Sequence, residues 1–221
     1  MTHYLPKNAH RIFEREQFAF KQLKENRTSE EIEQIKLEYK EVWHAWKELH
    51  LSVFEELSAD FSFEKPKIES WTNGWNLRNH FWSAYRLTDE PNSNACLAVL
   101  LNRRQLQVYL MYQHYKSDLR VGDAQTYNQA LSQLYEWSKS IHLTDYYIWP
   151  QQAHELENHL LLTDYLSDNQ KQVELANLIE QTSFQIGKLH YTSETLNDEK
   201  TFILEGFKEL MPLFQRTINQ T

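Results

Sequence analysis

An unbroken apolar stripe between residues 30 and 57 constrains the fold more than any other feature of this sequence. Its members recur at steps of three or four residues: Ile32, Ile35, Tyr39, Val42, Trp46, Leu49, Val53 and Leu57. This spacing predicts one amphipathic helix of about 28 residues, which would be about 42 Å long at about 1.5 Å per residue. Thr28 and Glu31 have the spacing of a capping box, so the helix is expected to begin directly after Thr28.

The stripe has to be covered, and the sequence leaves two ways open. An N-terminal helix at 8–26 and a sheet of the same chain could pack on it. Alternatively, the spacing persists for three heptads and permits a coiled-coil contact with a second copy. The eight Glu and three Lys between residues 30 and 57 are expected to form the solvated face of this helix.

The strongest β signals lie between residues 67 and 116. Asn73-Gly74 between aromatic runs predicts a hairpin, with residues 67–71 before it and Trp75 after it. Residues 80–87 form a third extended segment. The runs 95–101 and 105–115, separated by three polar residues, predict a second hairpin. In the second run an aliphatic set alternates with a polar and aromatic set, so one face is expected on the core and the other toward a cleft or a covering helix. The two sets are Leu106, Val108 and Leu110 against Gln107, Tyr109, Met111 and Gln113.

The remaining chain is predicted to be mainly helical. Helices are expected at 8–26, 123–141, 170–189 and 198–218, with helix favoured at 151–166, and residues 145–149 could form one more strand. Pro212 is expected to kink or break the last helix. Together these elements predict an α+β protein in which a largely antiparallel sheet packs against long N-terminal and C-terminal helices. We expect a single domain over 1–221, composed of a helical pair (1–58), the β region (67–116) and a mainly helical part (123–218).

Glycine scarcity excludes several enzyme classes. The chain has four glycines in 221 residues and contains neither G-x-G-x-x-G nor G-x-x-x-x-G-K-[ST]. Dinucleotide and nucleotide folds need glycine where the backbone approaches phosphate, so Rossmann dehydrogenases, P-loop NTPases and protein kinases are set aside. The sequence also has no G-x-S-x-G elbow, which argues against a standard α/β-hydrolase.

The single cysteine and the N-terminus predict a cytosolic protein. Cys96 cannot form an intrachain disulfide, and it is expected to be a small buried hydrophobe rather than a nucleophile. The first residues do not resemble a signal peptide, and no apolar run approaches the roughly 18 residues that span a bilayer. We therefore expect a soluble, cytoplasmic protein with no membrane contact.

A basic and aromatic cluster in the β region is the candidate site. The whole chain carries a net charge of −8, but residues 71–121 contain six Lys and Arg against three Asp and Glu. Guanidinium groups beside aromatic rings suit phosphate, carboxylate or nucleobase recognition. The plainer alternative is that the arginines are ordinary hairpin-tip residues and the aromatic rings pack the sheet against helices. The candidate ligand-binding residues are Arg78, His80, Trp82, Arg86, Arg103, Arg104, Tyr109 and His114.

No metal, cofactor or catalytic group is predicted. His154 and His159 resemble the H-E-x-x-H metalloprotease motif, but they are five residues apart instead of four. On a helix this offset turns the second histidine about 140° away from the first, so the two cannot share a zinc ion. The carboxylates are scattered, and no spacing marks an acid–base pair.

Three functional hypotheses follow, and the sequence leaves open whether any of them includes catalysis. The leading one is a binding or interaction module that holds an anionic or aromatic ligand, or a protein partner, on the β region. The second is a nucleic-acid-binding or nucleic-acid-processing accessory protein, with bases stacked on Trp75, Trp82 or Tyr109, although the net charge disfavours it. The third is an oligomeric structural protein, such as a homodimer, that assembles through the 30–57 helix.

Overall fold

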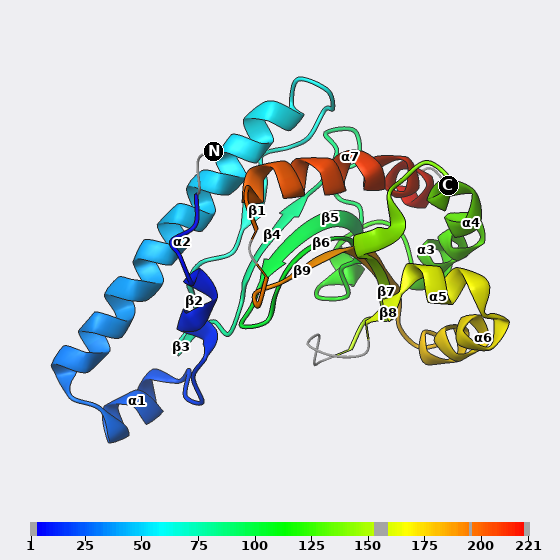
Figure 1. The fold of residues 1–221 in the computed structure, drawn as a ribbon. Helices are drawn as coiled ribbons and strands as arrows, with labels where there is room; N and C mark the ends of the chain where they lie inside the picture. Colours follow the sequence, from blue (N-terminus) through cyan, green and yellow to red (C-terminus); the bar gives the residue numbers. More distant parts are fainter. Residues whose placement is uncertain (1–3, 153–158, 195, 219–221) are drawn as a thin grey trace.

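The computed structural model describes residues 4–152, 159–194 and 196–218. Its centre is a seven-stranded sheet in which every neighbouring pair of strands is antiparallel (Figure 1). The strands β2 (Thr72–Asn73) and β3 (Asn76–Leu77) form a separate hairpin. In spatial order the strands of the large sheet are β1 (Lys67–Ile68), β4 (Phe81–Tyr85), β5 (Ala95–Leu101), β6 (Gln105–Tyr112), β9 (Phe184–Tyr191), β7 (Tyr146–Pro150) and β8 (Leu160–Leu161).

Helices precede and follow the sheet, which confirms the predicted α+β class. The two long ones, α2 (Ser29–Leu57) and α7 (Glu199–Ile218), pack on the same side of the sheet and contact each other. The shorter α-helices are α1 (Phe20–Asn26), α3 (Ala124–Asn128), α4 (Leu134–Ser138), α5 (Leu162–Ser167) and α6 (Asn169–Leu178). The described residues also form four 3-10 helices: η1 (Ala9–Phe13), η2 (Ser117–Leu119), η3 (Gln129–Gln133) and η4 (Leu143–Asp145).

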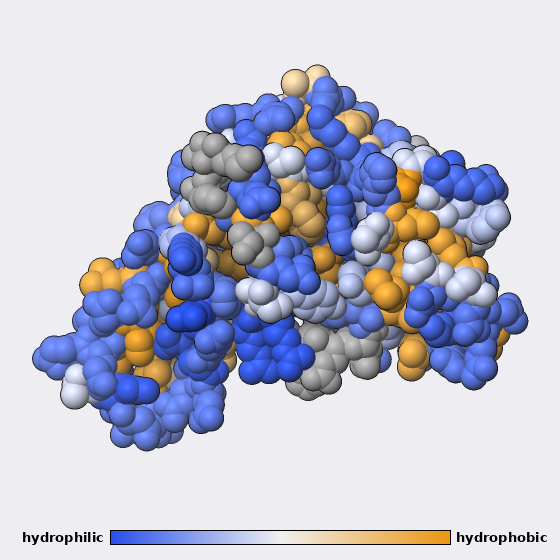
Figure 2. Space-filling view, viewed as in Figure 1, coloured by the Kyte–Doolittle hydropathy of each residue, from blue (hydrophilic) through white to orange (hydrophobic). Residues whose placement is uncertain are grey.

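Helix α2 forms as its sequence predicts. The Thr28 side chain accepts from the Glu31 backbone N–H, and the Glu31 carboxylate accepts from the Thr28 N–H, which completes the capping box. The apolar stripe packs into the main core, and Trp46 and Leu49 are fully buried within this chain. The stripe is therefore covered within the chain, which is the first of the two ways that the sequence left open. The outer surface of α1 and α2 is mostly hydrophilic in Figure 2, in keeping with the glutamate-rich face.

The two faces of β6 separate as the alternation predicts. Leu106, Val108 and Leu110 lie in the core beneath α7, whereas Tyr109 and Met111 belong to a second apolar cluster on the opposite face. Gly206 allows α7 to lie close to the sheet, because a Cβ at this position would be only 2.8 Å from Val108 Cγ1. Helix α7 continues through Pro212, so of the expected kink or break the break does not occur.

The prediction of a helix over 170–189 is wrong in its second half. Helix α6 ends at Leu178, and β9 occupies Phe184–Tyr191 between β6 and β7. Both faces of β9 are covered: Phe184 and Ile186 face the main core, while Gln185 is also fully buried. A strand covered on both sides loses the polar and apolar alternation by which strands are recognised.

Other expected boundaries also differ. The 8–26 segment is divided into η1 and α1, with no helix between Phe13 and Phe20. Asn8 takes a left-handed conformation (φ 65°), and its side chain makes no capping hydrogen bond. The 123–141 segment is divided into α3, η3 and α4, although Asp123 does cap α3 through the Thr126 N–H. At 151–166 the expected helix is present only as α5, which follows β8; residues 153–158 lie outside the described part.

The first hairpin is shorter than predicted. It consists of β2 and β3, and Gly74 has the positive φ (59°) that the turn requires. Lys67–Ile68 does not join this hairpin but pairs with β4 as the edge strand β1. The strand that was considered for 145–149 is β7.

None of the helices in the described ranges is long and apolar enough to span a membrane.

Candidate functional site

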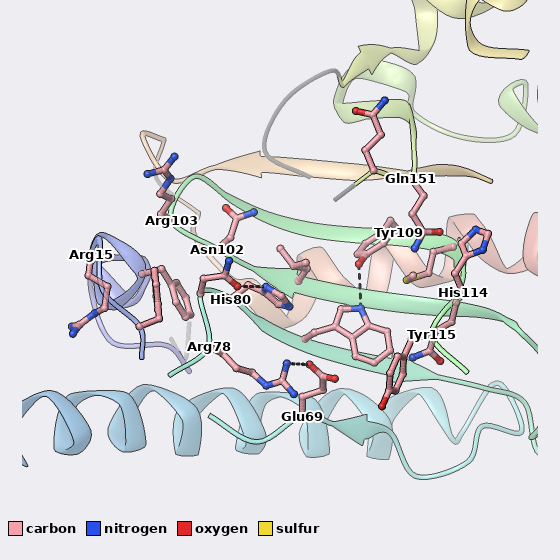
Figure 3. Close-up of a pocket in the computed structure, with 18 residues that line it drawn as sticks. Arg15, Glu69, Arg78, His80, Asn102, Arg103, Tyr109, His114, Tyr115 and Gln151 are labelled. Carbon is pink, nitrogen blue, oxygen red and sulfur yellow. Dashed lines mark hydrogen bonds and ion pairs between the residues drawn. The ribbon is translucent and has the colours of Figure 1, made fainter. Parts of the chain in front are cut away.

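A cavity of about 530 Å³ lies on the face of the sheet that points away from α2 and α7 (Figure 3). Its floor consists of Trp82, Leu100, Tyr109 and Met111, which share this face because alternate strand residues point the same way. Tyr109 lies opposite Ala98 on one neighbouring strand and opposite Gly187 on the other. Gly187 allows β6 and β9 to lie close together here, because a Cβ at this position would be 2.6 Å from Tyr109 Cβ.

Polar side chains from well-separated segments surround the floor. Figure 3 shows Arg15 and Arg103 at one end of the cavity and His114 and Tyr115 at the other. Arg15 follows η1, Arg103 belongs to the β5–β6 turn, and His114 and Tyr115 follow β6. Strand pairing brings the β5–β6 turn and the end of β6 to opposite sides of the same floor.

The charged lining is basic. The described residues of the lining include three arginines and one glutamate, which gives them a net charge of +2 with neutral histidines. Arg78 forms an ion pair with Glu69 at 2.6 Å, and its Nε also donates to the Ser70 carbonyl at 2.8 Å. Arg15 Nε donates to the Ile12 carbonyl at 2.8 Å. The Arg103 side chain is exposed and makes no hydrogen bond or ion pair with any residue in the described ranges. Among the residues that the structure describes, the Arg103 charge at the rim therefore has no ion-pair partner.

His80 adds a hydrogen-bond acceptor instead of a charge. Its Nδ1 lies 2.8 Å from Asn79 Oδ1, and since an amide oxygen only accepts, Nδ1 carries the proton. Nε2 is then the unprotonated nitrogen. Burial, with a smaller contribution from the Arg78 charge, lowers the pKa of His80 to about 4. At neutral pH His80 is therefore an uncharged ring that can accept a hydrogen bond from a ligand.

A serine–histidine contact beside the cavity has a structural role. His114 Nε2 lies 3.1 Å from Ser183 Oγ, and Ser183 donates to Gln151 Oε1 at 3.0 Å. A nucleophile has to be reachable by a substrate, yet Ser183 is fully buried and does not line the cavity. The contact fixes the position of His114 and Gln151, which do line it.

The structure brings six of the eight predicted residues to this cavity: Arg78, His80, Trp82, Arg103, Tyr109 and His114. Arg86 and Arg104 are not in its lining. Arg86 instead donates to the Ser93 carbonyl (2.8 Å) and to the Gln113 amide oxygen (2.6 Å). It thus orients Gln113, which lines the cavity, and does not face a ligand itself.

Several lining residues were not predicted. Arg15, Glu69, Tyr115 and Gln151 come from segments without a motif, and their proximity depends on the order of strands. Trp75, which was considered for base stacking, is 86% exposed on the β2–β3 hairpin and lies outside the lining.

The other predicted features are outside the cavity. Cys96 is fully buried, and burial raises the pKa of its thiol, which confirms the expectation of a buried hydrophobe. His154 lies outside the described residues, while the ring of His159 packs edge-on against Trp149 at 4.8 Å. Within the described ranges, no group of three or more His, Cys, Asp or Glu side chains is placed to hold a metal ion.

Fold and site together define an α+β protein with a basic cavity on one face of a seven-stranded antiparallel sheet. The chain belongs to a protein family whose model matches residues 5–217. This range includes every segment that lines the cavity. A Haemophilus influenzae protein described as an uncharacterized protein is 35% identical over 192 residues, which are 85% of this chain and 86% of that protein.

Proposed function

We propose that this protein binds a small anionic molecule with a planar group in the cavity on the open face of its sheet. The observation that carries the proposal is the net charge of +2 in a lining where Arg103 has no partner among the described residues, inside a chain of net charge −8. The volume of about 530 Å³ is within the range of about 300–1,000 Å³ typical of small-molecule sites.

Each part of the lining has a chemical role in this proposal. The Arg103 guanidinium donates to a carboxylate, sulfonate or phosphate of the ligand. Charge-assisted hydrogen bonds of this kind are stronger than those between neutral groups. The ion pair with Glu69 holds Arg78 in one orientation before the ligand arrives. His80 Nε2 accepts from a ligand N–H or O–H group, and the Gln113 and Gln151 amides supply neutral polar contacts.

The exposure of the aromatic rings favours a small ligand over a nucleic acid. Bases of a single strand stack on exposed ring faces. Trp82 is 6% exposed and Tyr109 is 1% exposed, so both act as the floor of a hollow. A small planar group that enters the hollow can contact the exposed part of Trp82, whereas successive bases of a strand cannot stack on rings that are this deeply buried.

An anionic aromatic probe tests the proposal directly. We expect 8-anilinonaphthalene-1-sulfonate to bind at one saturable site, as measured by fluorescence titration. Arg103→Ala should weaken binding about 10- to 100-fold, the equivalent of about 1.5–3 kcal/mol for a hydrogen bond to a charged group. Arg104→Ala is the matched control, because it removes the same charge from the adjacent position outside the lining.

Two further measurements decide between the hypotheses. The neutral analogue N-phenyl-1-naphthylamine should bind much more weakly than the sulfonate, and native mass spectrometry of the purified protein should reveal any retained small molecule. Equal weakening by Arg103→Ala and Arg104→Ala, or equal affinity for the neutral analogue, would overturn the proposal. Tight binding of single-stranded DNA that weakens steeply with salt would instead favour the nucleic-acid hypothesis.

A further inference from the structure

A second cavity continues the first one past the basic end. It has a volume of about 580 Å³ and lies between the segment after η1, helix α1 and the β5–β6 turn. Arg15 and Arg103 line both cavities. The two arginines therefore stand at a junction, and the positive charge lies in the middle of a longer binding space.

The position of this charge restricts the shape of the ligand. A ligand with a terminal anion would be matched by arginines at a closed end. Arginines with open space on both sides match an anion that has a substituent on each side, such as a phosphodiester or a pyrophosphate. Arg15 is held for this role, because Nε donates to the Ile12 carbonyl and the guanidinium carbon lies 5.1 Å from the centre of the Tyr39 ring.

Among the described residues, the lining of the second cavity contains two carboxylates, Glu14 and Glu16, whereas that of the first contains one, Glu69. Glu16 makes no hydrogen bond or ion pair with another residue of the described ranges, and Gln17 lines the second cavity next to Glu16. Carboxylate and amide oxygens accept hydrogen bonds from hydroxyl or ammonium groups. Arg27, also in the lining, is already paired with Glu31 at 3.2 Å. The second cavity thus offers acceptors to a group rich in donors.

We propose that the ligand has two parts joined by a bridging phosphate, as in a nucleotide linked to a sugar. The planar group occupies the first cavity over Trp82 and Tyr109, the phosphate lies between Arg15 and Arg103, and a hydroxylated or amine-bearing group extends toward Glu16. This inference rests on the proposed function and adds the length and the central anion of the ligand.

Competition against 8-anilinonaphthalene-1-sulfonate tests the inference. Two long probes, ADP-ribose and UDP-glucose, are compared with AMP and UMP. We expect at least one long probe to displace the dye at a concentration at least 10-fold lower than its monophosphate. Gln17→Trp, which fills the second cavity, should remove this advantage while the dye itself binds as before. Gln22→Trp is the matched control, because Gln22 is exposed on α1 and does not line the cavity.

Glu16→Gln provides an independent variant that keeps the side-chain size, and it should reduce the same advantage by several-fold. Failure of both long probes to exceed their monophosphates, or an unchanged advantage in Gln17→Trp and Glu16→Gln, would overturn the inference. In either case, dye binding that still depends on Arg103 leaves the proposed function standing. Loss of that dependence would remove both.

Discussion

Lowering the pH from 7 to 5 is expected to cost this protein about 2 kcal/mol of unfolding free energy through one side chain, His50. His50 is fully buried, and its Nδ1 lies 2.6 Å from the Tyr85 hydroxyl. That hydroxyl donates to the His50 carbonyl at 3.2 Å, so it accepts from Nδ1–H. Nε2 is then unprotonated, and it has no hydrogen-bond partner among the described residues. A proton added there would be a buried charge without an acceptor.

The magnitude follows from the two pKa values. Burial lowers the pKa of His50 from 6.5 to about 3 in the folded protein. Because the folded pKa is the lower one, the unfolded chain takes up the proton first, and stability that is present above pH 6.5 is lost as the pH falls toward 3. At about 1.36 kcal/mol per pH unit, the loss is about 0.2 kcal/mol at pH 7 and about 2.1 kcal/mol at pH 5. The expected change is therefore about 1.9 kcal/mol.

Urea unfolding at pH 7 and pH 5, followed by tryptophan fluorescence, measures this change in the wild type and in His50→Phe. Phenylalanine keeps a ring at this position, and the Tyr85 hydroxyl keeps the backbone carbonyl of residue 50 as its acceptor. The other histidines titrate in both proteins, so the difference between the two pH effects reports on His50 alone. The reasoning is refuted if His50→Phe loses as much stability between pH 7 and pH 5 as the wild type does.

Three further changes test the fold. Thr28→Ala removes the capping box of α2 and should cost about 1 kcal/mol in urea unfolding, while Thr28→Ser should cost much less. Gly206→Ala places a Cβ 2.8 Å from Val108 Cγ1 and should lower the free energy of unfolding by about 1–3 kcal/mol. Adding Val108→Ala to the same chain should restore part of this loss. If nothing is restored, the contact between residues 206 and 108 is not the cause. Cys96 is fully buried with a raised pKa, so a thiol reagent should label it in urea but hardly at all in the folded protein; rapid labelling under native conditions would show that the site opens.

The parts of the fold that the sequence predicts well are those with a strong local period. The stripe from Ile32 to Leu57 repeats over the whole of α2, and the β5–β6 hairpin combines two apolar runs with a three-residue connection. In both cases the residues that define the pattern are near neighbours in the chain. Partners elsewhere were not needed to recognise either element.

Strand β9 shows where such reasoning fails. Val173, Leu175, Leu178 and Ile179 continue to Ile186 at a spacing that a helix also allows, so the helical pattern of α6 extends into the strand. The available signal was the short polar break at Thr182 and Ser183. Both faces of β9 are buried and both of its edges are paired, with β6 and β7, and a single sequence does not show that position.

In the candidate site, too, some residues could be predicted from the local pattern and others depend on the order of the strands. Strand alternation alone placed Tyr109 on one face with Met111 and Gln113, whereas Gln151 reaches this face only because β9 brings β7 next to β6. Arg86 also shares the face of Trp82, but it lies beyond the end of β4, where Ser93 and Gln113 take up its hydrogen bonds. Alternation gives the side of a sheet and not the partners that a side chain meets there.

The central position of β9 also determines when this protein can fold during its synthesis. Strand β6 is complete at Tyr112 and β7 at Pro150, but the strand that joins them ends at Tyr191, 79 residues after β6. At about 5–20 residues per second, the ribosome needs about 4–16 s to make that stretch. Strand β6 has a free hydrogen-bonding edge throughout this interval, and β7 has one from the time it is complete at Pro150. Such edges are the sites where unfinished chains pair with one another. A nascent chain of this protein is therefore expected to depend on chaperones until β9 has emerged.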